Sequence, residues 1–137
     1  MMKTSTLAIT LFLFSTSTLA DVAVIVHPSN GSAIDATAVT KIFTGKSKSF
    51  SDGSKVAPVS QNASSDVAKE FNKKALKKSS SQLKAYWSKL VFTGKGTPPK
   101  DLSNDAAVLK HVASTPNAIG FVSAGSVDDS VKVVQNY

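Results

Sequence analysis

The chain has 137 residues with a formal net charge of +7, and each of its 16 basic residues is a lysine. Zero cysteines exclude disulfides, thiolate nucleophiles and thiolate metal sites, and the lack of arginine argues against the bidentate recognition of oxyanions or guanine that a planar guanidinium allows. A basic surface attracts anions such as phosphate, lipid headgroups or nucleic acid, although it also simply keeps a protein soluble.

Residues 1–20 have the pattern of a secretory signal peptide. A positive start at Lys3 is followed by the apolar run Leu7–Phe14 and by small residues up to Ala20. This run is too short to span a bilayer, and no other apolar run in the sequence approaches the necessary length of about 18 residues. We therefore expect an exported protein whose mature part, residues 21–137, is one domain with a core of its own.

The mature sequence begins with a predicted strand and a predicted helix. Val22–Val26 is apolar without alternation, which is typical of a strand buried on both faces, as in a parallel sheet. The run ends at the loop His27–Ser32. Asp35 then caps an amphipathic helix, which Gly45 ends.

A second strand and helix follow a polar stretch. Lys55–Gln61 alternates well enough to be a strand, and Pro58 within it indicates an edge, an end or a bulge. The turn Asn62–Ser65 then opens into a helix over Asp66–Leu76, which carries apolar residues at helical spacing.

The clearest helical period in the chain comes next. Ser79 and Gln82 have the spacing of a capping box at the start of this helix. Its apolar stripe consists of Leu83, Tyr86, Trp87, Leu90 and Val91. We expect these five large side chains to be buried against the sheet or another helix.

The last elements complete the predicted fold class. After a loop at Gly94–Lys100, a helix around Ala106–Ala113 precedes strands at Ala118–Val122 and Val131–Val134. Strands therefore alternate with helices along the chain. This order predicts an α/β fold with a mostly parallel sheet and helices on both faces.

Catalysis has little support in the sequence. His27 and His111 are the only histidines, Glu70 is the only glutamate, and no Gly-x-Ser-x-Gly motif is present. A serine hydrolase, a zinc site or a pair of catalytic carboxylates would each need more than this. The lysines do not alternate with aromatic residues as in nucleic-acid-binding proteins. We predict no enzyme, no cofactor, no metal and no nucleic-acid partner.

Two polar loops are the best candidates for a binding site. Ligands of open α/β sheets bind at the carboxyl ends of the strands, and both loops leave such ends in our prediction. The alternative is that a serine of the second loop only caps the helix, whose first-turn Asp66 would repel an anion. The candidate ligands are Ser29, Asn30 and Ser32 in the first loop and Ser64 and Ser65 in the second, with Lys46 or Lys95 as loose counter-ions.

Several short motifs occur in a recognisable order along the mature chain. They are Ala38–Lys46, Asp52-Gly53, Pro58-Val59, a serine-rich turn into the helix that carries Phe71, Tyr86-Trp87, Phe92–Gly96, Pro98-Pro99 and Pro116–Val122. Taken together, these motifs resemble the phosphate-type periplasmic solute-binding proteins of bacterial ABC transporters, most of all their short, single-lobe relatives.

The resemblance implies a periplasmic α/β binding lobe without enzymatic activity, and phosphate or a similar oxyanion as the ligand. In the family, the segment that matches Ser60–Asp66 commonly reads Arg, then Ser-Gly-Thr at the helix start, and it grips phosphate. Gln61 stands where the Arg is expected, and Ser64 matches the serine. Ser65 replaces the glycine and Asp66 replaces the threonine. By this resemblance, Gln61 joins the candidate ligands.

Full members of that family close two lobes over the ligand, whereas this chain has the length for one. We therefore expect binding to be weak or to need a partner lobe. The alternative is an envelope structural or interaction module that has lost ligand binding. Such a module would present its basic face to another envelope or transporter protein, or to an anionic glycolipid.

Overall fold

The computed structural model describes residues 21–137, and the predicted signal peptide at residues 1–20 lies outside the described residues. In chain order, the elements are β1 (Val22–Val26), α1 (Ala36–Phe43), β2 (Ala57–Gln61), α2 (Asp66–Phe71), the π-helical turn η1 (Asn72–Leu76), α3 (Ser80–Phe92), β3 (Lys100–Leu102), α4 (Asp105–Ser114), β4 (Ala118–Ser123), the 3-10 turn η2 (Ala124–Ser126) and β5 (Lys132–Asn136). Between residues 21 and 137, no helix combines the length and apolar character needed to cross a bilayer.

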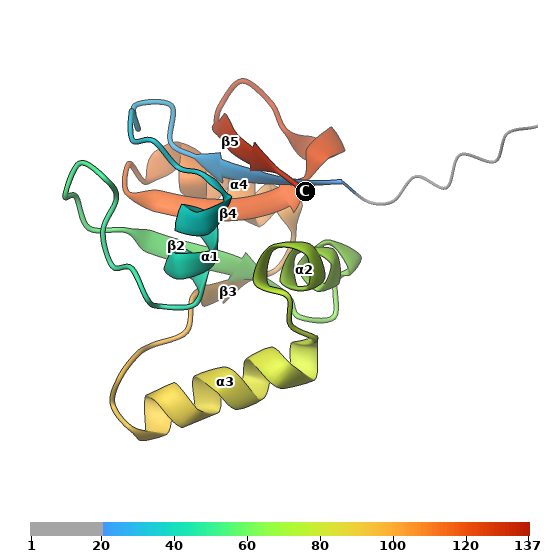
Figure 1. The fold of residues 1–137 in the computed structure, drawn as a ribbon. Helices are drawn as coiled ribbons and strands as arrows, with labels where there is room; N and C mark the ends of the chain where they lie inside the picture. Colours follow the sequence, from blue (N-terminus) through green and yellow to red (C-terminus); the bar gives the residue numbers. More distant parts are fainter. Residues whose placement is uncertain (1–20) are drawn as a thin grey trace, which may run out of the picture.

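The strands of the described part form one five-stranded sheet in the order β3-β2-β4-β1-β5 (Figure 1). β2 is parallel to β3 and β4, whereas β1 is antiparallel to both of its neighbours, β4 and β5. Four of these five strands thus run in one direction, and the prediction of a mostly parallel sheet is confirmed. The parallel pairing that the apolar run Val22–Val26 indicated is wrong, because burial on both faces leaves the direction of a strand open.

β3 lies at the end of a segment that the sequence predicts to be a loop. It has only three residues, and Lys100 pairs with Val59 of β2 at the edge of the sheet. A strand of this length is too short to show an alternating pattern, so sequence periodicity could not identify it.

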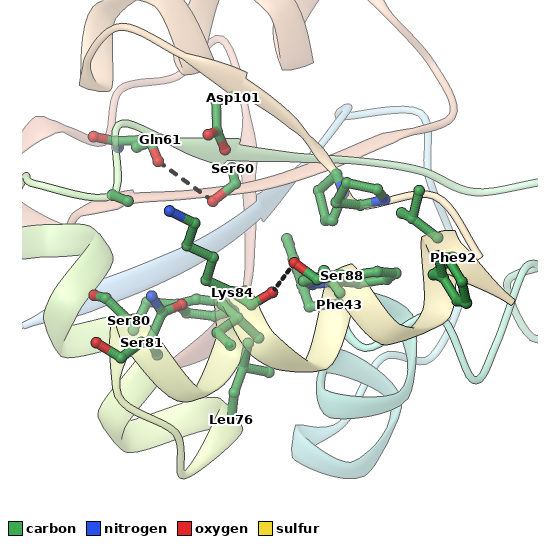
Figure 2. A pocket seen from close by; sticks show the side chains of 18 residues that line it. Phe43, Ser60, Gln61, Leu76, Ser80, Ser81, Lys84, Ser88, Phe92 and Asp101 are labelled. Atoms are coloured by element: carbon green, nitrogen blue, oxygen red, sulfur yellow. Dashed lines mark hydrogen bonds between the residues drawn. The ribbon is translucent and has the colours of Figure 1, made fainter. Parts of the chain in front are cut away.

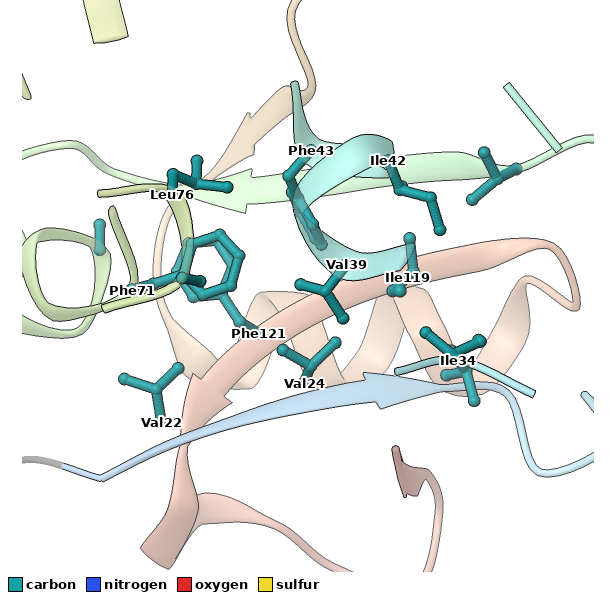
Figure 3. Close-up of a cluster of buried hydrophobic side chains, with 14 of the residues drawn as sticks. Val22, Val24, Ile34, Val39, Ile42, Phe43, Phe71, Leu76, Ile119 and Phe121 are labelled. Carbon is teal, nitrogen blue, oxygen red and sulfur yellow. The ribbon is translucent and has the colours of Figure 1, made fainter. Parts of the chain in front are cut away.

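Three phenylalanines form the centre of the larger core (Figure 3). The ring of Phe71 stacks on the ring of Phe121 with 4.0 Å between centroids. Phe43 meets both rings edge-on, at 4.9 and 5.9 Å. Because these rings come from α2, β4 and α1, the cluster fixes two helices to one face of the sheet. The other face is covered by α4, so the predicted helices on both faces are confirmed.

α4 packs closely on β4 at Gly120. A Cβ at this position would lie 2.7 Å from Cγ1 of Val108 and 3.0 Å from Cγ2 of Val59. We expect Gly120→Ala to lower the free energy of unfolding by about 2 kcal/mol, because overpacking forces the neighbours to move. Chemical denaturation measures the change. Gly31→Ala is the control, since a Cβ there meets nothing within 4 Å, and an equal loss in both variants would contradict the prediction.

The predicted helix caps are confirmed. Asp35 accepts a hydrogen bond from the N–H of Ala38 at 2.8 Å, and Ser79 and Gln82 form the capping box of α3. Gly45 follows α1 with a φ of 73°, in the left-handed region that favours glycine. Each of these signals depends on residues only a few positions apart.

α3 stands away from the sheet (Figure 1), and this corrects the prediction for its apolar stripe. Of the five stripe residues, only Trp87 is buried, and Val91 is 54% exposed. The Trp87 ring lies against Gly45, and the Tyr86 hydroxyl donates to the C-cap carbonyl of α1 at 2.6 Å. α3 is therefore held mainly to the end of α1, because a helical period predicts an apolar face but not the element that covers it.

Candidate functional site

The two candidate loops lie at opposite ends of the sheet. Val26, the last residue of β1, pairs with Ile119, which also pairs with Pro58 near the start of β2. The loop Pro28–Ser32 therefore lies beside the beginning of β2, whereas Asn62–Ser65 follows its end. The prediction that both loops contribute to one pocket is wrong, because the carboxyl-end rule joins loops only when their strands run in the same direction.

The first loop mostly satisfies its own polar groups. The Ser29 hydroxyl lies 2.7 Å from Nδ1 of His27, and the buried Asn30 accepts from the N–H of Ser32 at 2.9 Å. The carbonyl of Asn30 accepts from the ammonium of Lys132 at 3.1 Å. Within residues 21–137, the buried hydroxyl of Ser32 has no hydrogen-bond partner. The three candidate residues of the first loop therefore lie close to one another, but at the opposite end of the sheet from the candidates Ser64 and Ser65.

In the second loop, Ser65 is the N-cap of α2. Its hydroxyl accepts from the N–H of Ala68 at 3.2 Å and donates to the carbonyl of Asn62 at 2.7 Å. The N–H of Ser64 donates to the side chain of Asn62 at 2.9 Å. The capping alternative is therefore confirmed for Ser65. The exposed hydroxyl of Ser64 makes no hydrogen bond to any described residue, and its role as an anion ligand stays a prediction.

Gln61 belongs to an internal hydrogen-bond network. It is buried, and its side-chain amide donates to Oδ1 of Asp105 at 2.5 Å and to the carbonyl of Phe121 at 2.9 Å. Asp105 also accepts from the N–H of Ser123 at 3.2 Å and the hydroxyl of Ser126 at 2.7 Å. Both amide hydrogens of Gln61 are therefore occupied. Although Gln61 stands at the Arg position of the family pattern, it has no donor left for an anion, which corrects its assignment as a ligand.

The same network sets the charge of Asp105. Burial raises the pKa of this carboxyl, but the hydrogen bonds from Gln61, Ser126 and Ser123 together outweigh burial and hold the pKa below its ordinary value of 3.8. The carboxylate thus stays ionised and joins α4 to the ends of β2 and β4. Its part in the fold is structural.

A groove of about 840 Å³ lies between α3 and the β2–β3 side of the sheet (Figure 2). Apolar side chains that include Phe43, Phe71 and Trp87 form much of its wall. The loop after β2 also borders the groove, through Ala63. Its lining residues are Phe43, Ser60, Gln61, Ala63, Phe71, Asn72, Leu76, Ser80, Ser81, Leu83, Lys84, Trp87, Ser88, Val91, Phe92, Pro98, Pro99 and Asp101.

Lys84 is the residue of this groove that sequence reasoning missed. Its side chain extends from α3 across the groove toward Ser60 and Gln61 (Figure 2). Among the described residues, the one ion pair joins Lys74 to Glu70 at 3.4 Å, so Lys84 has no carboxylate in contact. The spacing of Ser80, Lys84 and Ser88 could have placed them on one side of the helix, but not opposite β2.

Asp101 is the opposing charge in the groove. It lies on the edge strand β3, and burial raises the pKa of its carboxyl above the ordinary value of 3.8. A partly desolvated carboxylate repels an anion, so the groove has one cation and one anion at its polar side. The repulsion from Asp101 favours weak over tight binding of an anion in this groove.

The histidines do not form a catalytic arrangement. The ring of His27 hydrogen-bonds only to Ser29: Nδ1 lies 2.7 Å from the hydroxyl of that residue and accepts from its N–H at 3.1 Å. No third residue within the described part of the chain orients the ring. His111 lies in the last turn of α4. Residues 21–137 contain no group of three or more histidine, cysteine, aspartate or glutamate side chains that could hold a metal ion.

The fold is similar to part of several solved binding proteins. One is an ABC-type phosphate transport receptor from Vibrio cholerae, with 21% sequence identity and a TM-score of 0.57; the match covers 85% of this chain and 46% of that chain. A second is a putative phosphate ABC transporter substrate-binding protein with bound phosphate from Clostridium perfringens, with 21% identity, a TM-score of 0.55, and 85% and 45% coverage. A third is PstS from Borrelia burgdorferi, with 14% identity, a TM-score of 0.57, and 85% and 47% coverage.

The similarity to these structures is a similarity of fold alone, and the chain spans about half the length of the structures it matches. The resemblance noted in the sequence is therefore confirmed at the level of the fold. No protein-family model matches the chain, and no curated protein matches it.

Proposed function

We propose that this chain is a non-enzymatic, single-lobe module that binds phosphate or a similar small oxyanion at the groove beside the carboxyl end of β2. The observation that carries the proposal is Lys84, a cation without a contacting carboxylate that extends toward this end of β2 (Figure 2). Lys84 would supply the positive charge that Gln61 does not supply at the Arg position. The exposed Ser64 hydroxyl is the second donor, on the loop that borders the groove.

The solved structures of similar fold support the proposal. Their names describe a phosphate transport receptor, a phosphate transporter substrate-binding protein and PstS, and one of them holds phosphate. The chain matches about half of each of them, and we propose that it supplies one wall of a binding cleft. An anion on one wall stays in contact with water, which weakens each charged contact. We therefore infer millimolar affinity for the isolated lobe, and tighter binding with a partner lobe or a transporter protein.

The predicted signal peptide supports a periplasmic location, since residues 1–20 have the features of an export signal. We propose that the mature protein consists of residues 21–137 and meets its anion outside the cytoplasm. Sequencing the N-terminus of the exported protein tests the cut before Asp21.

Phosphate should stabilise the protein, and Lys84→Gln should weaken this effect. At ten times the dissociation constant, a ligand that binds only the folded state adds about 1.4 kcal/mol to the free energy of unfolding. We expect Lys84→Gln to bind phosphate about tenfold more weakly, because a charge-assisted hydrogen bond is lost. Calorimetric titration with phosphate measures the affinity, and melting with increasing phosphate measures the stabilisation.

The control variant is Lys89→Gln, which removes the same charge from α3 at an exposed position outside the groove. Equal weakening of phosphate binding in both variants would mean that the affinity depends only on the net charge of the protein. A flat titration of the unaltered protein would contradict the proposed function altogether.

A second candidate function is an envelope interaction module, and one observation favours it. The end of α3 exposes two apolar side chains, Val91 at 54% and Phe92 at 93%. Exposed apolar groups beside a hollow surface are typical of protein contact sites. A protein whose melting ignores all oxyanions, but whose association with an envelope protein is lost in Phe92→Ser, would support this function instead.

A further inference from the structure

A second hollow of the surface is surrounded by lysines. It has a volume of about 560 Å³ and lies where η1 ends and α3 begins. Its lining residues are Lys69, Lys73, Lys77, Lys78, Ser79 and Ser80. Four of these six side chains carry an ammonium group. This hollow shares only Ser80 with the groove of the proposed function, and the inference below does not depend on that function.

The π-helical turn keeps three of the lysines on one side. Lys69, Lys73 and Lys77 follow one another at intervals of four residues. In an α-helix, a residue four positions further on lies about 40° further around the helix axis, so a row of lysines at this interval gradually turns away from one side. The wider π-turn over Asn72–Leu76 rotates less per residue and opposes this drift. Lys77 then adopts a left-handed conformation with a φ of 56°, which ends the turn and leads the chain to Lys78 and α3.

The positive charge of the hollow is not neutralised by carboxylates. In residues 21–137, the single ion pair joins Lys74 to Glu70, and Lys74 does not line the hollow. The ammonium of Lys78 lies 5.4 Å from the centre of the Tyr86 ring, a contact that leaves its charge in place. Like charges at helical spacing destabilise a helix, so a bound anion would relieve their repulsion.

The start of α3 adds donors to the same hollow. The capping box occupies the N–H groups of Ser79 and Gln82. The N–H of Ser80, in contrast, has no acceptor among the described residues. Lysines near the end of α2 and η1 also interact favourably with the negative end of the helix dipole. That interaction alone does not require the lysines to surround one hollow. Four cations and a helix start together form a surface for strongly negative groups.

We propose that this hollow binds a ligand with two or more clustered phosphate groups. The lysines from position 69 to position 77 extend over roughly 12 Å along the helix, which is too far for one phosphate to contact them all. Lysine ammonium groups are mobile point charges, and they suit a flexible polyanion better than a fixed planar geometry. The same chemistry occurs in a soluble diphosphate and in phosphate headgroups at a membrane surface.

The test uses the full mature chain with two probes. Calorimetry measures binding of inorganic pyrophosphate, and co-sedimentation measures binding to phosphatidylcholine vesicles with and without phosphatidic acid. We expect binding to at least one probe that weakens with salt. We expect Lys73→Gln/Lys77→Gln to weaken it about 30-fold, since each lysine near the surface contributes about a factor of five.

The control variant is Lys48→Gln/Lys55→Gln, which removes the same net charge at two exposed lysines that do not line the hollow. Binding of pyrophosphate alone would identify a soluble ligand, and binding of acidic vesicles alone would identify a headgroup. No binding to either probe, or equal weakening in both double variants, would overturn the proposal. Lys84→Gln should leave this binding unchanged, which separates the hollow from the phosphate groove. If the first variant melts early, Lys69→Gln/Lys78→Gln replaces it.

Discussion

Phe71→Ala should lower the free energy of unfolding by about 4 kcal/mol, the largest effect expected for a single substitution in this chain. The Phe71 ring is 1% exposed, stacks on Phe121 at 4.0 Å and meets Phe43 edge-on at 4.9 Å. Truncation removes both aromatic contacts and leaves a cavity where α2 packs on the sheet. Urea unfolding measures the loss, and the slope of the transition should stay unchanged if only stability is affected.

Phe92→Ala is the matched control, because Phe92 is the same residue type at 93% exposure. Its truncation should leave the unfolding free energy unchanged to within about 0.5 kcal/mol. A large loss in this variant would mean that α3 packs against the rest of the chain in solution. A loss below about 1 kcal/mol for Phe71→Ala would mean that the three-ring cluster does not hold α2.

Asp105→Ala should have the second-largest effect, a loss of about 3 kcal/mol in the free energy of unfolding. The carboxylate accepts hydrogen bonds from Gln61, Ser123 and Ser126, and the substitution leaves these donors without an acceptor. An unsatisfied buried donor costs about 1–3 kcal/mol, and Gln61 is 2% exposed. Thermal unfolding at neutral pH measures the loss.

The same residue should give the protein a pH dependence of known sign. Hydrogen bonds hold the pKa of Asp105 below its ordinary value of 3.8 in the folded state. The unfolded chain therefore binds the proton more readily, and the stabilisation is fully present above that ordinary value. It declines as the pH falls toward the lowered folded value. Stability measured between pH 6 and pH 3 should thus fall less steeply in Asp105→Ala than in the unaltered protein.

Asp128→Ala is the control for the measurement at neutral pH. Asp128 also accepts hydrogen bonds from a nearby serine, Ser130, but it lies in an exposed turn near the end of the chain. Its removal should change stability at neutral pH much less than the removal of Asp105. Similar losses in the two variants would mean that any aspartate in a turn has this effect, and that the network around Gln61 has no special part in the fold.

The helix starts show how far sequence reasoning reaches in this chain. Asp35 and Ser79 were identifiable as caps because a cap contacts N–H groups two or three residues ahead. Ser65 shows the limit of the same reasoning. A serine at a helix start fits both a cap and an anion ligand, and its hydrogen bonds to Ala68 and Asn62 decide for the cap.

Gln61 and Lys84 show what the candidate site required beyond pattern. Gln61 matches a ligand position by its place in the chain, but its amide is turned to Asp105, 44 residues further on. Lys84 has no motif around it, yet it extends into the groove beside β2 (Figure 2). Neither fact could be derived from spacing, because each depends on a partner distant in sequence.

The α/β class, the positions of most helices and strands, and a positive charge made of lysine alone could be read from the amino-acid sequence. Three features required the folded arrangement: β1 runs against its neighbours, the two polar loops lie at opposite ends of the sheet, and much of the α3 stripe is uncovered. The two groups differ in the distance along the chain over which the residues interact. Caps, turns and apolar periods depend on neighbours a few residues apart, whereas strand direction and helix docking depend on pairings between distant parts of the chain.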